Sequence, residues 1–359
     1  MSIQSLVDIP PRCTEVFRGG IRHPALWLWD SWTAYDGVSL HLYSLALSRT
    51  APDGTPIMPG DRNSFPFHVR HFVSHDDGLS WCDLGAVAKP GAVADGADER
   101  NVWSGSVLQA PDGRWLYGFT GLRAGTPETE FIQTIFVAEG DLSDAVGEWP
   151  NEALSCPVRD YEKIRAAGYF LGPKEELGWN TGEEGGPILA WRDPYLFYDA
   201  NGVLNAVWAA KMGPAVPAVA RAAIRKEDGR FILDRLYAPI TLPDADQFTQ
   251  AEVPKIYQDD ASGVYYLLIS ACDRLYEGQP NAEVTMEMRL YKAKTLDGPW
   301  QPFHAAGSRL PELGDLFGAS IISPARMDEK LIFLGPYTEN AGPEKQLTFA
   351  APVTVKQNT

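Results

Sequence analysis

Residues 74–81 read Ser-His-Asp-Asp-Gly-Leu-Ser-Trp and continue a strand-like run that begins at residue 65. Asp76 can accept hydrogen bonds from the amides of a tight turn, and Gly78 can adopt the positive φ angle that such a turn requires. Trp81 would then pack beneath the turn. The pattern predicts a hairpin and marks architecture, without carrying chemistry of its own.

Working outward from this hairpin, strand-like runs recur along the chain between turn sequences such as DGRW and LDGPW. They are 40–48, 65–74, 115–122, 134–140, 195–199, 203–211, 264–272, 288–294 and 330–337. The 33 glycines and 28 prolines are spread over the whole sequence, which favours many short elements over a few long helices. The chain is therefore predicted to be all-β: a sandwich, a barrel or a propeller. The hairpin itself resembles the Asp box, S-x-D-x-G-x-[ST]-W, which is common in sialidase-like propellers.

No low-complexity linker divides the 359 residues, and a large all-β domain can reach this length alone. We expect a single domain over 1–359, with residues 1–20 as an N-terminal extension. A short helix is predicted over 160–168, ending at Gly168. The segment 170–190 is expected to be a long loop of the kind that often binds ligands or covers a site.

The formal net charge of −16 argues against nucleic acid as a partner, because phosphate binding needs clustered Lys and Arg. A neutral or cationic ligand fits this charge, and solubility alone explains it equally well. The N-terminal sequence lacks the pattern of a signal peptide, and no apolar run approaches the ~18–20 residues that span a bilayer. We therefore expect a cytoplasmic protein without a membrane partner, while export without a signal stays open.

The four cysteines and six histidines form no metal motif. No C-x-x-C pair and no H-E-x-x-H pattern is present, and His68 and His71 would not share a face of their strand. We expect no catalytic metal and no required cofactor. The cysteines are expected to be structural thiols, and the sequence fixes neither their pairing nor an oligomeric state.

Three carboxylates stand in segments that could carry chemistry. Asp30 lies within LWLWDSW, where aromatic walls would desolvate it and stack a sugar ring. Asp193 lies within WRDPY, and Pro194 indicates an irregular strand that can redirect a side chain into a cleft. Glu252, within QAEVPK, looks partly buried, and burial raises the pKa of a carboxyl group, as a general acid requires. Each also has a structural explanation: a turn cap, an ion pair and an exposed strand edge, respectively.

Other residues of these segments could assist. Ser104, within NVWSGS, can bond a carboxylate or a sugar hydroxyl. Arg274 follows an apolar strand, and its planar fork suits carboxylates and sugar hydroxyls. Gln250 would share a face with the glutamate two positions later. Arg192 and Asp193, as neighbours in a strand, are expected to point to opposite faces and therefore not to pair with each other.

Taken in order, five segments resemble the motifs of glycoside hydrolase family 68, the levansucrase and inulosucrase family. Its patterns WDSWP, WSGS, RDP, ExER[AP] and DSR read here as WDSW, WSGS, RDP, QAEVP and CDR at 29–32, 103–106, 192–194, 250–254 and 272–274. LDGPWQPF and LTFAAP, nearer the C-terminus, are similar to the family's LTGPYxPL and STFAPS. The resemblance runs from about residue 26 to the C-terminus. It implies a five-bladed β-propeller with a central, funnel-shaped active-site pocket.

The resemblance also implies roles for the matching residues. Asp30 would be the nucleophile, Asp193 the transition-state stabiliser and Glu252 the general acid/base. The substrate-binding residues would be Trp29, Trp103, Ser104, Arg192, Gln250 and Arg274. The chain would then be a retaining β-fructofuranosidase or fructosyltransferase that acts on sucrose or a related fructoside through a covalent fructosyl-enzyme. A structural calcium ion, present in part of the family, is compatible with this expectation.

Three positions depart from the family pattern. Val253 stands where an arginine follows the acid/base, Gln250 where an acidic residue precedes it, and Thr33 where a proline follows WDSW. The first two are expected near the leaving group and the acceptor. We therefore expect a short-product fructosyltransferase or a β-fructofuranosidase, and no synthesis of long levan.

Two alternatives stay open. A propeller glycosidase of family 43 type, acting on arabinosides or xylosides, would share the fold and the three-acid layout but usually inverts, with carboxyl groups ~6.5–9.5 Å apart instead of ~5–5.5 Å. A catalytically impaired propeller would bind sugars without turnover. In each case the expected partners are small-molecule sugars, a donor and, for transfer, an acceptor.

Overall fold

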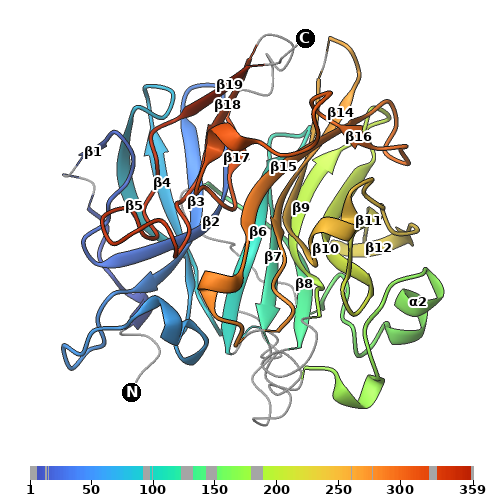
Figure 1. Ribbon diagram of the computed structural model, residues 1–359, viewed down its shortest axis with the longest axis horizontal. Coiled ribbons are helices and arrows are strands. Elements are labelled where there is room, and N and C mark those ends of the chain that lie inside the picture. The colour runs from blue at the N-terminus through green and yellow to red at the C-terminus, as the bar shows by residue number, and fades with distance from the viewer. Residues whose placement is uncertain are drawn as a thin grey trace.

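The computed structural model describes residues 6–12, 14, 16–91, 98, 100–122, 132–142, 152–178, 189–259, 261–276, 278–322 and 330–356. The strands β1–β19 found in these residues form five sheets, which follow one another along the chain (Figure 1). Every run predicted from the sequence to be a strand overlaps one of them.

The first sheet has the order β1-β5-β4-β3-β2 and the others are consecutive along the chain. The first sheet comprises β1 (Val16–Arg18), β2 (Leu26–Tyr35), β3 (Leu40–Ser48), β4 (His68–Ser74) and β5 (Ser80–Ala88). The second comprises β6 (Asn101–Gln109), β7 (Trp115–Leu122) and β8 (Gln133–Gly140), and the third β9 (Arg192–Tyr198), β10 (Leu204–Gly213), β11 (Val216–Glu227) and β12 (Arg230–Leu236). The fourth comprises β13 (Gln250–Gln258), β14 (Tyr265–Cys272), β15 (Met286–Ala293) and β16 (Gln301–Pro302), and the fifth β17 (Ser320–Ile321), β18 (Lys330–Leu334) and β19 (Val353–Lys356).

The five sheets form a ring, and the inner strands of the blades are β2, β6, β9, β13 and β17. Strand β2 contacts β6, β6 contacts β9, β9 contacts β13, and β17 contacts β2. The Ile321 amide at the start of the fifth blade donates to Tyr257 Oη in β13 at 3.0 Å. Ile21 and Phe349 exchange two backbone hydrogen bonds, of 2.9 and 3.2 Å, which join the last blade to the first. The molecule is therefore a five-bladed β-propeller, and the predicted fold is confirmed.

Apolar side chains fill the spaces between neighbouring blades. Leu28, Phe72 and Trp81 of the first blade, all fully buried, pack against Leu334 and Phe349 of the last one. Similar clusters lie between each further pair of adjacent blades. Because every sheet buries both faces against its neighbours, the blades hold their inner strands in fixed positions around the centre.

The hairpin between β4 and β5 has the predicted geometry. The Asp76 carboxylate accepts from the Ser80 amide at 2.8 Å and from its hydroxyl at 2.6 Å. Gly78 has φ = +84°, and Trp81 is fully buried and donates from Nε1 to the Gly78 carbonyl at 3.1 Å. The turn is thus held by side chains of the 74–81 motif itself.

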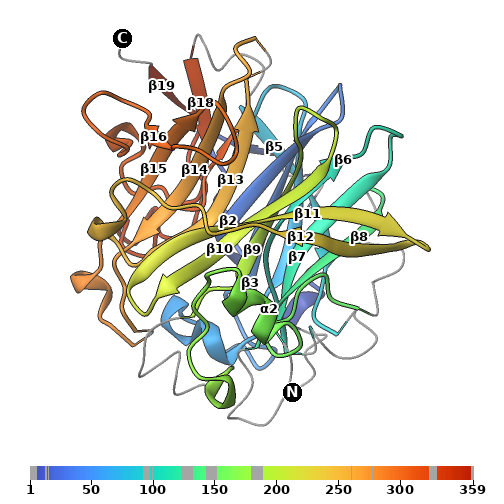
Figure 2. The same ribbon diagram turned by 90° about the vertical axis from the view of Figure 1, so that its right-hand side faces the viewer.

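Helical elements lie in the connections. Helix α2 (Tyr161–Ala166) ends before Gly168, whose φ is +100°, as predicted. Figure 2 shows α2 in front of the sheets, on the outside of the molecule. Short 3₁₀ helices are η1 (Pro59–Ser64), η2 (Lys174–Glu176), η3 (Ala245–Gln247), η4 (Asn281–Glu283) and η5 (Pro311–Leu313). The predicted loop 170–190 is described in part, since residues 179–188 lie outside the described residues.

A buried ion pair ties the first blade to the segment before β1. Arg70 on β4 donates to both carboxylate oxygens of Asp83 on β5, at 2.7 and 2.6 Å, and both side chains are fully buried. His23 Nε2 lies 3.3 Å from the same carboxylate. Arg70 also donates to the carbonyls of Ile9 and Pro10 at 2.6 and 2.8 Å. All three nitrogens of the Arg70 guanidinium thereby donate to acceptors inside the protein.

Candidate active site

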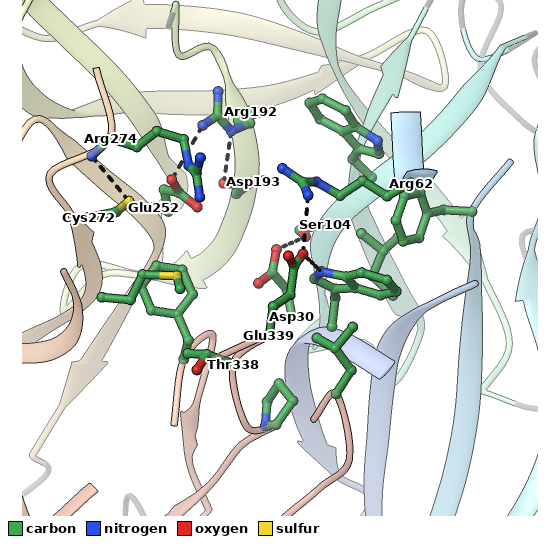
Figure 3. Close-up of a pocket in the computed structure, with 18 of the residues that line it drawn as sticks. Asp30, Arg62, Ser104, Arg192, Asp193, Glu252, Cys272, Arg274, Thr338 and Glu339 are labelled. Carbon is green, nitrogen blue, oxygen red and sulfur yellow. Dashed lines mark hydrogen bonds and ion pairs between the residues drawn. The ribbon is translucent and has the colours of Figure 1, made fainter. Parts of the chain in front are cut away.

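A cavity of about 180 Å³ lies where the inner strands converge (Figure 3). It is called the central cavity below. The structure brings to it all of the sequence-predicted site residues except Gln250. These are Trp29 and Asp30 from β2, Trp103 and Ser104 from β6, Arg192 and Asp193 from β9, Glu252 from β13, and Arg274 after β14.

A β-bulge interrupts each of the four inner strands that carry these residues. Leu28 pairs with Ala46 and Ser31 with Ser44, so that two residues of β2, Trp29 and Asp30, stand opposite one residue of β3. The same extra residue occurs on β6 at Ser104, on β9 at Asp193–Pro194, and on β13 after Glu252. Bulges reorient side chains and are common next to active sites.

The bulges explain how sequence neighbours share the cavity. In a regular strand, successive side chains alternate between the two faces. Here both members of the pairs Trp29–Asp30, Trp103–Ser104 and Arg192–Asp193 line the central cavity. The irregular strand start that Pro194 predicted is therefore confirmed.

Asp30 is held by a hydroxyl from the next blade. Ser104 Oγ donates to Asp30 Oδ2 at 2.6 Å (Figure 3), a short distance typical of a hydrogen bond to an ionised carboxylate. Asp30 is partly accessible from the cavity, yet it lies deep in the propeller, and this desolvation raises its pKa. The Ser104 hydrogen bond, Lys255 and Arg192 act in the opposite direction and favour the charged form.

Gly318 forms the wall behind Asp30. Its φ is +62°, and a Cβ atom at this position would stand 2.7 Å from Asp30 Oδ1 and 2.9 Å from Asp30 Cα. A side chain cannot be accommodated there without moving the carboxylate. The fifth blade thus contributes backbone, and no carboxylate, to this part of the site.

Asp193 adopts a backbone conformation that is unusual for a residue with a side chain. Its φ is +64°, its amide donates to Thr120 Oγ1 at 2.8 Å, and its carboxylate accepts from the Val253 amide at 3.2 Å. Val253 also has a positive φ, +45°. Strain of this kind, on the order of 1–3 kcal/mol per residue, persists where the surrounding structure enforces it, often at functional sites.

The expectation that Arg192 and Asp193 do not pair is wrong. Arg192 Nε lies 3.7 Å from Asp193 Oδ2, and its Nη2 lies 3.7 Å from Glu252 Oε1 (Figure 3). The positive φ and the bulge at Asp193 break the alternation of the strand, which brings both side chains to one side. Arg192 consequently stands between the two carboxylates.

The electrostatic setting of Asp193 is unfavourable for charge. Its carboxyl group is 5% exposed, and burial raises its pKa to about 7, with Asp30 and Glu252 adding repulsion and Arg192 opposing it. The side chain of Glu252 keeps 22% of its surface exposed. A cluster of carboxylates that repel one another in a cleft is a common feature of catalytic sites.

Two predicted substrate-binding residues have different positions. Arg274 lines the cavity and donates to the Gln279 carbonyl at 2.5 Å and to Asn281 Oδ1 at 2.6 Å. Gln250 is 1% exposed, and its Nε2 donates to the Arg274 carbonyl at 3.2 Å. Gln250 therefore supports the arginine from behind. Val253, which like Gln250 departs from the family pattern, is also buried and does not line the cavity.

Sequence reasoning missed a polar group on the side of the cavity where Trp29 lies. Glu339 accepts from Trp29 Nε1 and from Arg62 Nη1, each at 3.3 Å, and from Asn281 Nδ2 at 2.9 Å (Figure 3). Arg62 lies in η1, Asn281 in η4, and Glu339 follows β18. The only signal in the sequence was the position of Glu339, two residues after the predicted strand 330–337.

The central cavity also contains a thiol. Burial raises the pKa of the Cys272 thiol to about 12, which makes this cavity residue a poor nucleophile. In the part of the chain that the structure describes, no three His, Cys, Asp or Glu side chains gather as a metal site would require.

No described helix has the length and apolar character to cross a bilayer.

Solved structures of levansucrases have a similar fold. A variant of Bacillus subtilis levansucrase in complex with oligosaccharides superposes with a TM-score of 0.65 at 14% identity, over 98% of this chain and 89% of that one. A Bacillus megaterium levansucrase variant gives a TM-score of 0.62 at 18% identity, over 93% and 83%. No family model matches the sequence, and no curated protein matches it. The likeness, at these identities, establishes the levansucrase-type propeller fold of this chain.

Proposed function

We propose that this protein is a retaining β-fructofuranosidase or fructosyltransferase that acts on sucrose or a related fructoside. The observation that carries the proposal is the convergence of Asp30, Asp193 and Glu252, from three different blades, on one cavity. The levansucrase-like fold supports the choice of a fructoside as donor.

In the proposed reaction, Asp30 attacks the anomeric carbon of the fructosyl unit while Glu252 protonates the leaving oxygen. The bond from the anomeric carbon to that oxygen breaks, and a covalent fructosyl-enzyme forms on Asp30. Glu252, now deprotonated, then removes a proton from water or from an acceptor hydroxyl, which attacks the same carbon and releases Asp30.

The environment of each carboxylate supports these roles. The Ser104 hydroxyl fixes one oxygen of Asp30 and leaves the other free to attack. Asp193 stands beside Asp30 and Glu252, where its charge can stabilise an oxocarbenium-like transition state. Arg192, 3.7 Å from both Asp193 and Glu252, can hold these two groups in register with a bound sugar.

The test compares wild type, Asp30→Ala and Glu252→Ala on sucrose, with glucose and fructose measured separately. We expect wild type to release glucose and Asp30→Ala to lose this activity by a factor on the order of 10⁴ or more. Glucose in excess of fructose would show transfer to an acceptor. Asp112→Ala, a change at an exposed ion pair on the β6–β7 turn, is the control for handling and folding.

Two results would contradict the proposal. Wild type could be inert on sucrose and on a panel of other fructosides while hydrolysing arabinosides or xylosides. Alternatively, the product first released could have the inverted anomeric configuration, which a covalent fructosyl-enzyme does not give.

A further inference from the structure

A buried lysine lies just behind the candidate active site. Lys255 follows the bulge of β13 and is 1% exposed. Its Nζ donates to the carbonyls of Gly318 and Ala319 at 3.3 and 2.9 Å. No carboxylate of the described residues lies within ion-pair distance of Nζ. The ammonium group is thus fully desolvated, and its hydrogen-bond partners are neutral.

Such a group is costly unless negative charge lies near it, because the protein interior solvates an ammonium ion poorly. Burial lowers the pKa of Lys255 to about 7, and the nearby charges of Asp30 and Asp193 oppose this change. In turn, Lys255 favours the charged form of Asp30 more than Arg192 does. The lysine and the two aspartates therefore form one electrostatic unit.

We propose that Lys255 is a positioning residue that keeps Asp30 ionised and holds the Gly318 backbone against it. The inference rests on the proposed function, in which Asp30 must attack as a carboxylate. It adds a role for a residue that does not line the central cavity and would not touch the sugar.

The hydrogen bonds around Gly318 show how the positioning works. The Gly318 carbonyl accepts from Lys255 Nζ, from the Ser31 amide at 3.2 Å and from Ser31 Oγ at 3.1 Å. The Gly318 amide donates to Ser270 Oγ on β14, in the fourth blade, at 2.8 Å. Lys255 thus joins the fourth blade to the backbone that forms the wall behind the nucleophile.

The charged and titratable groups nearest Asp30 come from two blades, and Arg62 of η1 and Glu339 after β18 line the same cavity. Strand β9 contributes Arg192 and Asp193, β13 contributes Glu252 and Lys255, and β6 contributes only the neutral Ser104. Residues 317–319 of the fifth blade are Phe-Gly-Ala. Arg192 lies close to two other carboxylates, so that its charge is shared. Lys255 is therefore the cation whose removal should change the ionisation of Asp30 most.

The first test is the pH dependence of kcat/KM for Lys255→Met and Lys255→Gln. The glutamine retains a hydrogen-bond donor without the charge. We expect both variants to move the acid limb of the profile upward by about one pH unit and to lower kcat/KM near that limb about tenfold. The matched control is Lys211→Met, which removes another lysine that is 1% exposed and donates to a backbone carbonyl, that of Pro214, away from the cavity.

An acid limb that stays at the wild-type pH in both Lys255 variants, or that moves equally in Lys211→Met, would overturn the inference. If only Lys255→Met moved it, the effect would belong to the lost hydrogen bonds and not to the charge. That outcome would also overturn the role of Lys255 in keeping Asp30 ionised.

A second test does not depend on turnover. Lys255→Met is made in the wild-type background and in the Asp30→Asn background, and Tm is measured near pH 7. We expect the change in Tm to be more negative in the wild-type background, by about 2 °C or more, because there the substitution removes the nearby cation from both Asp30 and Asp193, whereas in the Asp30→Asn background only Asp193 loses it. Equal changes in both backgrounds would overturn the inference, even if wild type proved inert on every fructoside and the proposed function failed.

Discussion

Two buried aspartates of this propeller differ in one respect, the number of partners that compensate their charge. Asp83 is a residue of β5, and Arg70 donates to both of its oxygens while His23 lies beside it. Although burial opposes ionisation, these partners hold the pKa of Asp83 well below its usual range. Asp193 is also buried, with 5% of its surface exposed, but Arg192 Nε lies 3.7 Å from its Oδ2. Burial accordingly raises the pKa of Asp193 to about 7.

The difference separates a carboxylate that stabilises the fold from one to which the proposed function assigns a part in the reaction. A fully hydrogen-bonded buried pair gains from the low dielectric, whereas an incompletely compensated one costs free energy. Natural proteins tolerate such costs mainly at functional sites. Substitutions at the two aspartates should therefore have opposite effects on stability and on activity.

The largest expected effect is on the stability of Asp83→Ala. Removing this carboxylate leaves the Arg70 guanidinium buried without its anion, which should lower the free energy of unfolding by ~3–5 kcal/mol. Urea unfolding followed by tryptophan fluorescence measures the change. Asp112→Ala removes an ion pair whose side chains are about half exposed, and a loss of less than ~1 kcal/mol is expected there. Equal losses in the two variants would refute the contrast.

The second effect is on the activity of Asp193→Asn. The substitution keeps the size of the side chain but removes the charge opposite the developing cation, and kcat/KM should fall by a factor of about 10²–10³. Stability should stay the same or rise, since a buried charge is lost. Steady-state kinetics and urea unfolding on the same preparation check both statements. A variant that is destabilised but still active would show that Asp193, like Asp83, stabilises the fold and takes no part in the reaction.

The smallest effect is on the pH dependence of stability. Because the folded-state pKa of Asp193 is raised to about 7, the folded protein binds a proton that the unfolded chain has released between pH ~4 and ~7, and stability falls as pH rises through that window. Asp193→Asn lacks this contribution. Its stability relative to wild type should therefore increase from pH 4 to pH 7, by on the order of 1–2 kcal/mol. A constant difference across this range would count against the raised pKa. Asp83, with a lowered pKa, contributes stability above pH ~4 that is lost on further acidification.

Much of the fold could be predicted from local patterns. The 74–81 hairpin follows from the chemistry of its own Asp, Gly and Trp, and alternating apolar runs gave the strands. The sequence contains no repeat from which blades can be counted, because the sheets differ in strand number. The propeller was predicted from the resemblance to a family. That resemblance rests on short motifs and not on extended sequence similarity. Accordingly, the structures are alike although only 14–18% of the residues are identical.

The candidate site was predictable where a motif carried it and unpredictable where the backbone departs from regular geometry. Simple alternation in a strand gave the wrong relation between Arg192 and Asp193, because it contains no information about a positive φ in a residue with a side chain. Glu339 was missed because its partners lie in η1 and η4, far away in the sequence. Lys255 reads as an ordinary strand residue, and only the packing of β13 against the fifth blade shows it to be buried.

The bonds that join the last blade to the first have a consequence for the order in which the protein is made. Asp30 leaves the ribosome early, whereas Gly318, the wall behind it, follows 318 − 30 = 288 residues later. The Leu347 carbonyl, which accepts from the Leu28 amide at 3.0 Å, comes later still. A nascent chain that already contains Asp30, Asp193 and Glu252 therefore still lacks the backbone that lies against the first of them. Under the proposed function, activity therefore begins only when the ring is complete, and not when the motifs have been translated.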